Sequence, residues 1–97
     1  MRADPIELPV GLELARSTPE FDEQSVPAGL LAAHRVADDV WGRLVVTSGS
    51  LRFVFEDAVA GSAGRTIVAG EHQVIPPARA HHVELVGPVG FHVEFHR

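Results

Sequence analysis

Residues 70–81 carry the strongest indication of architecture in the chain, and they read Gly70-Glu71-His72-Gln73-Val74-Ile75-Pro76-Pro77-Ala78-Arg79-Ala80-His81. The prolines make the turn rigid and so fix the point where the next strand begins. A histidine at the mouth of such a strand presents its imidazole inward, against the opposing sheet of a closed barrel. The segment therefore predicts a β-barrel with His81 pointing into its interior.

Short apolar runs separated by Gly, Pro, Asp and Ser extend on both sides of this segment, as expected of strands joined by turns. The larger apolar side chains within residues 51–55 and 91–95 recur at every second position, which is the period of a half-buried strand. The runs cover residues 29–33, 40–47, 51–55, 65–68, 72–75, 81–86 and 90–95. About seven short strands in one small chain favour a closed barrel or a two-sheet sandwich, and a double-sheet jelly roll fits best.

The segments between these runs are expected to be turns and loops. Ser48-Gly49-Ser50 is typical of a hairpin turn, and Ala58 to Gly64 of a longer loop. Residues 28–36 hold the best helix formers, yet a strand or a short turn fits them about as well. Residues 1–24 mix proline, charge and short apolar stretches, which indicates an extended arm with one edge strand.

Length and composition limit the function. A chain of 97 residues, 45% hydrophobic and 22% charged, forms one globular domain over residues 1–97. A net charge of −5 with eight Lys and Arg residues spread thinly argues against a nucleic-acid partner. Because the sequence has no cysteine, any metal must be held by histidines and carboxylates. The absence of a signal-peptide pattern and of a run of ~20 apolar residues predicts a soluble cytoplasmic protein without a membrane partner.

The segment from Gly70 to His81 resembles the second cupin motif, although Ala78 replaces its usual second glycine and Leu85 stands where asparagine is frequent. From about residue 8 to the end, the chain is similar to the TehB/YeaR-like domain family of small bacterial cupins. The resemblance is carried by residues 16–21, 27–31, 34, 41–46, 49–53, 76–77, 81 and 93–95. It implies a cupin-type jelly-roll barrel, often dimeric, with a buried metal site.

The same resemblance says little about biological role. Some members precede a methyltransferase domain and are named for tellurite resistance, while others stand alone and are expressed under nitrate or stress. The 97 residues contain no methyltransferase half, so tellurite methylation is not expected of them.

The upstream half of a cupin site supplies two histidines and a glutamate on a strand that ends at a glycine. With Gly49 as that end, His34 lies one residue out of register for the first ligand, and a bulge near residues 38–39 would correct this. Val36 and Trp41-Gly42 occupy the other positions and offer no ligand.

Glu94 is the expected carboxylate, because it lies in the part of the last strand that matches the family. His34, His81 and Glu94 would give a facial triad for iron or a three-ligand zinc site, and nickel or manganese would also suit such ligands. Alternation of side chains argues against Glu94: if Val93 faces the core, Glu94 faces out, unless a bulge near Gly90 reverses it.

Each candidate also has a purely structural interpretation. His34 and His81 are ligands or satisfied, partly buried histidines, and Glu94 is a ligand or a solvated carboxylate. Trp41 lines the cavity mouth, or belongs to the core or a dimer interface. Arg43 binds an anionic ligand, or lies on an exposed strand face together with Arg52.

We expect a metal-binding cupin that binds or slowly transforms a small oxidised or anionic molecule during tellurite, nitrate or oxidative stress. The alternative is a homodimeric, non-catalytic module that binds or senses a ligand without metal and pairs through the face of Trp41. A purely structural dimer is a third alternative. Because no acid, base or substrate clamp is identifiable beyond the metal ligands, the sequence leaves open whether the protein is an enzyme.

Overall fold

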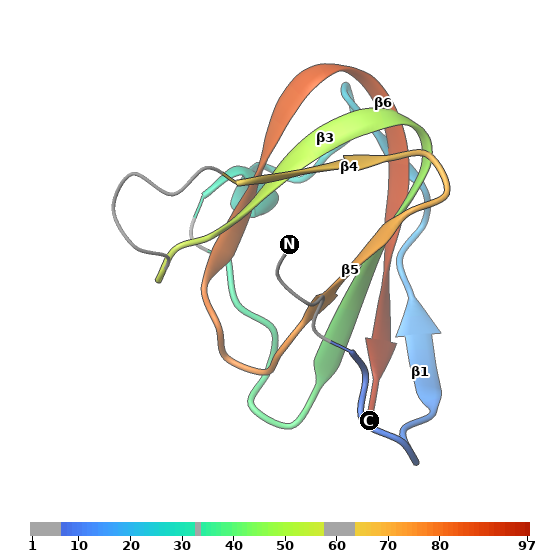
Figure 1. Ribbon diagram of the computed structural model, residues 1–97, viewed down its shortest axis with the longest axis vertical. Helices are drawn as coiled ribbons and strands as arrows, with labels where there is room; N and C mark the ends of the chain where they lie inside the picture. Colours follow the sequence, from blue (N-terminus) through green and yellow to red (C-terminus); the bar gives the residue numbers. More distant parts are fainter. Residues whose placement is uncertain (1–6, 33, 58–63) are drawn as a thin grey trace, which may run out of the picture.

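The computed structural model describes residues 7–32, 34–57 and 64–97 (Figure 1). Two long antiparallel strands form its frame: β3 (Trp41–Phe55) and β6 (His81–His96), which pair from Trp41↔His96 to Phe55↔His81. Both strands curve strongly along their length, as Figure 1 shows, so that the ribbon they form wraps around the interior. The prediction of an all-β fold is confirmed.

Shorter strands extend this frame on both sides. The N-terminal strands β1 (Leu14–Ser17) and β2 (Phe21–Asp22) pair with β6, while β4 (Arg65–Val68) and β5 (His72–Ile75) pair with β3. The path through the sheet is β1-β6-β3-β4, and every pairing is antiparallel. The bounds of β4 and β5 are those that the sequence predicts.

The predicted hairpin turn at Ser48-Gly49-Ser50 is wrong, because β3 runs through it without reversing. The register against β6 shifts on both sides of Gly49 instead, as in a β-bulge, which bends a strand while keeping it paired. Gly49 has φ +66°, and a Cβ there would lie 2.0 Å from the carbonyl oxygen of Pro88. Glycine is therefore required by the bend. In the same way, the predicted runs 81–86 and 90–95 are parts of one strand, β6.

Residues 28–32 and 34–36 do not form a strand. They begin with a single 3-10 turn, η1 (Ala28–Leu31), and His34 then makes an isolated antiparallel bridge to His81. The predicted loop from Ala58 to Gly64 lies almost wholly outside the described residues. This bridge ties the segment after η1 to the start of β6.

The core fills the space enclosed by the curved strands. Its fully buried side chains alternate along β3 and β6 and are completed from the shorter strands; the largest are Phe91, Leu44, Leu51, Ile67, Ile75, Val46 and Val83. Among the described residues only Gln73 and His81 are buried polar side chains. A buried polar group costs free energy unless it is hydrogen-bonded. Of the two, His81 has the titratable side chain.

Candidate functional site

His81 opens β6 with its imidazole inside the barrel, and the residue is only 2% exposed. Its ring stacks on that of Phe53, with centroids 5.2 Å apart and planes 17° apart. Its Nδ1 lies 3.2 Å from the backbone carbonyl oxygen of Arg79. Burial lowers the pKa of His81, more than the Arg79 carbonyl raises it, so the ring is neutral. Since a carbonyl only accepts, Nδ1 carries the proton and Nε2 is unprotonated.

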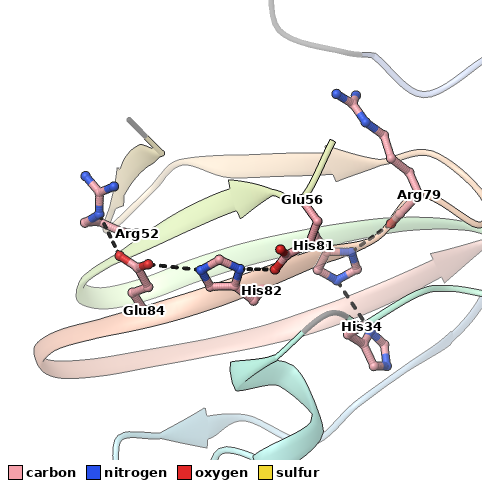
Figure 2. A network of polar contacts seen from close by, with 7 residues as sticks. All are labelled: His34, Arg52, Glu56, Arg79, His81, His82 and Glu84. Carbon is pink, nitrogen blue, oxygen red and sulfur yellow. Dashed lines mark hydrogen bonds and ion pairs between the residues drawn. The ribbon is translucent and has the colours of Figure 1, made fainter. Parts of the chain in front are cut away.

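His34 faces His81 across the isolated bridge. The two backbones exchange hydrogen bonds, 2.7 Å from His34 N to His81 O and 2.9 Å from His81 N to His34 O. The side chains follow: His34 Nδ1 lies 3.4 Å from His81 Nε2, with the rings edge to face (Figure 2). Because His81 Nε2 has no proton, His34 Nδ1 is the donor in this contact. Burial also lowers the pKa of His34, so the pair is neutral.

Both imidazoles line a cavity of about 180 Å³ inside the barrel. The other lining residues are apolar, among them Phe21, Leu30 and Leu44, except for Thr18. The Thr18 hydroxyl is already engaged, since it donates to the Pro19 carbonyl and accepts from the backbone amide of Val93. The histidines are therefore the polar groups that a molecule in this cavity would meet. The volume is below the roughly 300–1,000 Å³ of pockets for drug-sized ligands, so the cavity suits a smaller one.

Glu94 does not join the two histidines. It follows the buried Val93 and lies on the outer face of β6, where it accepts hydrogen bonds from Arg43 (3.0 Å), His96 (3.0 Å) and His92 (3.3 Å). Burial alone would raise the pKa of Glu94, but the hydrogen bonds from His96, Arg43 and His92 lower it to about 2. Alternation along β6 thus decides against the expected triad: the register shift beside Gly90 has its extra residue, Thr47, on β3, so Phe91 and Val93 stay buried and Glu94 faces out.

The fit of a metal ion to the remaining pair can be tested from geometry. Two nitrogens bound to one tetrahedral zinc at usual bond lengths lie about 3.4 Å apart. The contact between His34 Nδ1 and His81 Nε2 has this length. His81 also gives its other N–H to a backbone carbonyl, as metal-bound histidines do. However, no group of three or more His, Asp or Glu side chains in the described parts of the chain is placed to hold a metal. The residues fit two positions of a metal site and no more.

Trp41 and Arg43, the expected ligand-binding residues, are not among the residues that line the cavity. Both alternate along β3 with inward-facing Gly42 and Leu44, and Arg43 is paired with Glu94. Arg52 is similarly paired with Glu84 at 3.0 Å. These side chains therefore belong to the polar outer face of the barrel.

A second polar network, which sequence reasoning did not predict, lies along the other end of the outer face. It runs from Arg52 to Glu84, from Glu84 to His82, and from His82 to Glu56 (Figure 2). The hydrogen bond to Glu84 raises the pKa of His82 against a smaller effect of burial, and Glu56 adds to the rise. The alternation of β6 is the signal that separates this histidine from His81.

Comparison with known proteins agrees with the fold. A family model described as "TehB-like domain" matches residues 16–93. The uncharacterized protein YeaR of Escherichia coli strain K12 is 27% identical over 97 residues, which cover 93% of this chain and 82% of YeaR. A crystal structure of a protein from the same strain superposes with a TM-score of 0.83 at 26% identity and covers 95% of this chain and 96% of the other.

More distant structures show the fold alone. TehB from Haemophilus influenzae superposes with a TM-score of 0.77 at 20% identity, over 88% of this chain and 31% of TehB. A cupin-2 domain containing protein from Shewanella frigidimarina superposes with a TM-score of 0.54 at 18% identity, over 92% of this chain and 82% of the other. In the described residues, no helix has the length and apolar character needed to cross a membrane.

Proposed function

The chain belongs to the TehB-like domain family, and on that premise we propose that it is a cupin that binds a small molecule inside its barrel through His34 and His81. The observation that carries the proposal is the long contact made by His81 Nε2, the unprotonated ring nitrogen, beside an apolar cavity. Its contact with His34 is 3.4 Å long, beyond the usual 2.7–3.2 Å of an N–H donor. Because this contact is long, a ligand hydroxyl or N–H that replaces it at Nε2 gains a stronger hydrogen bond.

The chemistry of the cavity limits the class of ligand. An apolar lining with two neutral imidazoles disfavours a bare anion, since a charge moved out of water needs a partner of opposite charge. The expected ligand is therefore uncharged and small, with an apolar body and one group that donates a hydrogen bond. The proposal is for binding. A role in tellurite, nitrate or oxidative stress is the biological setting that the family suggests.

Phenol and toluene form a matched pair of probes for this proposal, because they share a ring and differ in one hydroxyl. In calorimetric or NMR titrations, phenol should bind at least ~5-fold more tightly than toluene, the worth of about one hydrogen bond. In a His81→Leu variant the preference should disappear while toluene still binds. Equal affinities for the two probes in the unmodified protein would contradict the proposal.

A divalent metal held by His34 and His81 is a second candidate. It is favoured by the 3.4 Å separation of the two nitrogens and by the carbonyl that fixes the tautomer of His81. A metal there would act as a Lewis acid toward a small molecule in the cavity. Titration with Zn²⁺ tests this candidate directly. Phenol titrations in the presence and absence of a chelator separate the two candidates, because phenol binding that persists in chelator belongs to the histidines themselves.

A further inference from the structure

A groove of about 410 Å³ adjoins the interior cavity, and His34 and Phe95 line both. Arg16, Arg35 and Arg97 line the groove as well, and its other lining residues are apolar. Among the residues that the structure describes, the groove has no acidic side chain in its lining. Three cationic side chains from β1, from the segment after η1 and from the end of the chain thus converge on one depression.

The arginines of the groove differ from those of the outer face in their partners. In the described part of the chain, the ion pairs formed by arginine are those of Arg43 with Glu94, Arg52 with Glu84 and Arg79 with Asp57. The groove arginines form none of these ion pairs. In a chain with a net charge of −5, this segregation leaves positive charge concentrated at one place.

Two of the groove arginines are nonetheless held in position. The Arg16 guanidinium carbon lies 4.6 Å from the centroid of the Phe95 ring, a cation–π contact, and its strand pairs Arg16 with Phe95. Arg35 Nη1 donates to the carbonyl of Ala78 at 3.1 Å, and the amide of Ala78 donates in turn to the carbonyl of Val36. A guanidinium has five N–H donors, so a stacking contact or one hydrogen bond leaves most of them available.

We propose that this groove is a binding site for a small oxyanion, a carboxylate or phosphate group, recognised by Arg16 and Arg35 with Arg97 nearby. Planar guanidinium groups bind such anions through paired hydrogen bonds, which a neutral ligand cannot match. A long polyanion is disfavoured because the rest of the protein is acidic. The site does not depend on the ligand proposed for the barrel interior, although both share the wall formed by His34 and Phe95.

The test is a titration of the whole chain with two probes, inorganic phosphate and succinate, followed by calorimetry at constant ionic strength. Each of Arg16→Gln and Arg35→Gln should weaken binding of the preferred anion about 10-fold, the usual effect of losing one charged hydrogen-bonding partner. Arg52→Gln is the matched control, because it removes an arginine of the outer face and should leave the affinity unchanged. The stronger of the two probes identifies phosphate or carboxylate as the group that is recognised.

His81→Leu should also leave anion binding unchanged, so that failure here and failure of the interior site can be told apart. Arg35→Lys keeps the charge without the planar pair of donors and should give an intermediate affinity. Circular dichroism and melting curves establish that each variant is folded. Binding of neither probe, or an equal loss of affinity in Arg52→Gln, would overturn the proposal.

Discussion

His81 and His82 are adjacent in β6, yet their imidazoles lie on opposite faces of the barrel wall and their pKa values move in opposite directions. Burial in the interior lowers the pKa of His81, whereas hydrogen bonds to Glu84 and Glu56 on the outer face raise the pKa of His82. Alternation of side chains along one strand therefore places a histidine with a lowered pKa beside the cavity and one with a raised pKa among carboxylates on the outer face.

The two histidines should affect the pH dependence of stability with opposite sign. An unfolded histidine becomes protonated below about pH 6.5, while folded His81 takes up its proton only at lower pH, so His81 makes the fold less stable as pH falls. The raised pKa of His82 instead stabilises the fold below that pH, and this contribution disappears as pH rises through the folded value. Urea unfolding from about pH 5.5 to 8.5 measures both effects.

Relative to the unmodified protein, His81→Gln should become less destabilising as pH falls and His82→Gln more destabilising. Each variant serves as the control for the other, since the residues are neighbours in one strand. Parallel pH profiles for the two variants would be inconsistent with the opposed environments.

Gly49→Ala should unfold or severely destabilise the protein, by well over the ~1–2 kcal/mol of a left-handed residue alone. The added Cβ would lie 2.0 Å from the Pro88 carbonyl oxygen, and backbone must move to relieve the clash. Gly70→Ala is the matched control: Gly70 also has positive φ, +90°, but no atom lies within 4 Å of the added Cβ. Denaturant midpoints for the two variants give the comparison, and similar losses would contradict the role of Gly49 in the bend.

Glu94→Gln should cost roughly 2 kcal/mol at neutral pH, because a partly buried carboxylate loses charged hydrogen bonds with Arg43, His92 and His96. The pKa of Glu94, about 2, lies below its unfolded value, so this contribution is present above about pH 4.5 and lost as pH falls toward 2. Glu84→Gln, at a more exposed position, should cost less. Glu94→Gln should not change the affinity of His34 and His81 for Zn²⁺. A large fall in that affinity would identify Glu94 as a metal ligand.

Zinc binding tests the second candidate function separately. If His34 and His81 hold a metal, the unmodified protein should bind one Zn²⁺ per chain, and His34→Ala and His81→Ala should each lose it. His92→Ala is the control, because His92 lies on the outer face with Glu94. Metal analysis of protein purified without an affinity tag gives the measurement, and equal metal content in all four proteins would exclude the pair as the site.

The sequence predicts the parts of the fold that follow from local patterns. The bounds of β4 and β5 follow from apolar runs between turn residues, and the inward direction of His81 follows from the rigid entry at Pro76. Gly49 shows where local reasoning fails: glycine suits both a hairpin turn and a bulge, and only pairing with distant Pro88 and Val89 decides between them.

The candidate site was only partly predictable for the same reason. His34 and His81 are identified from motif spacing and do meet, although their role as metal ligands stays a prediction. Family resemblance favours Glu94 as a ligand while the alternation of its strand argues against it, and the structure follows the alternation. Arg16, Arg35 and Arg97 lie far apart in the sequence, and only the meeting of β1, β6 and the segment after η1 brings them to one groove.

The central claim concerns the unprotonated Nε2 of His81, and long-range ¹H–¹⁵N NMR of the histidine side chains tests it most directly. The account predicts that His81 carries its proton on Nδ1, that Nε2 has the shift of an unprotonated nitrogen, and that phenol moves this Nε2 signal while toluene does not. A proton on Nε2 of His81, or an Nε2 signal that phenol at saturating concentration leaves unmoved, would contradict it.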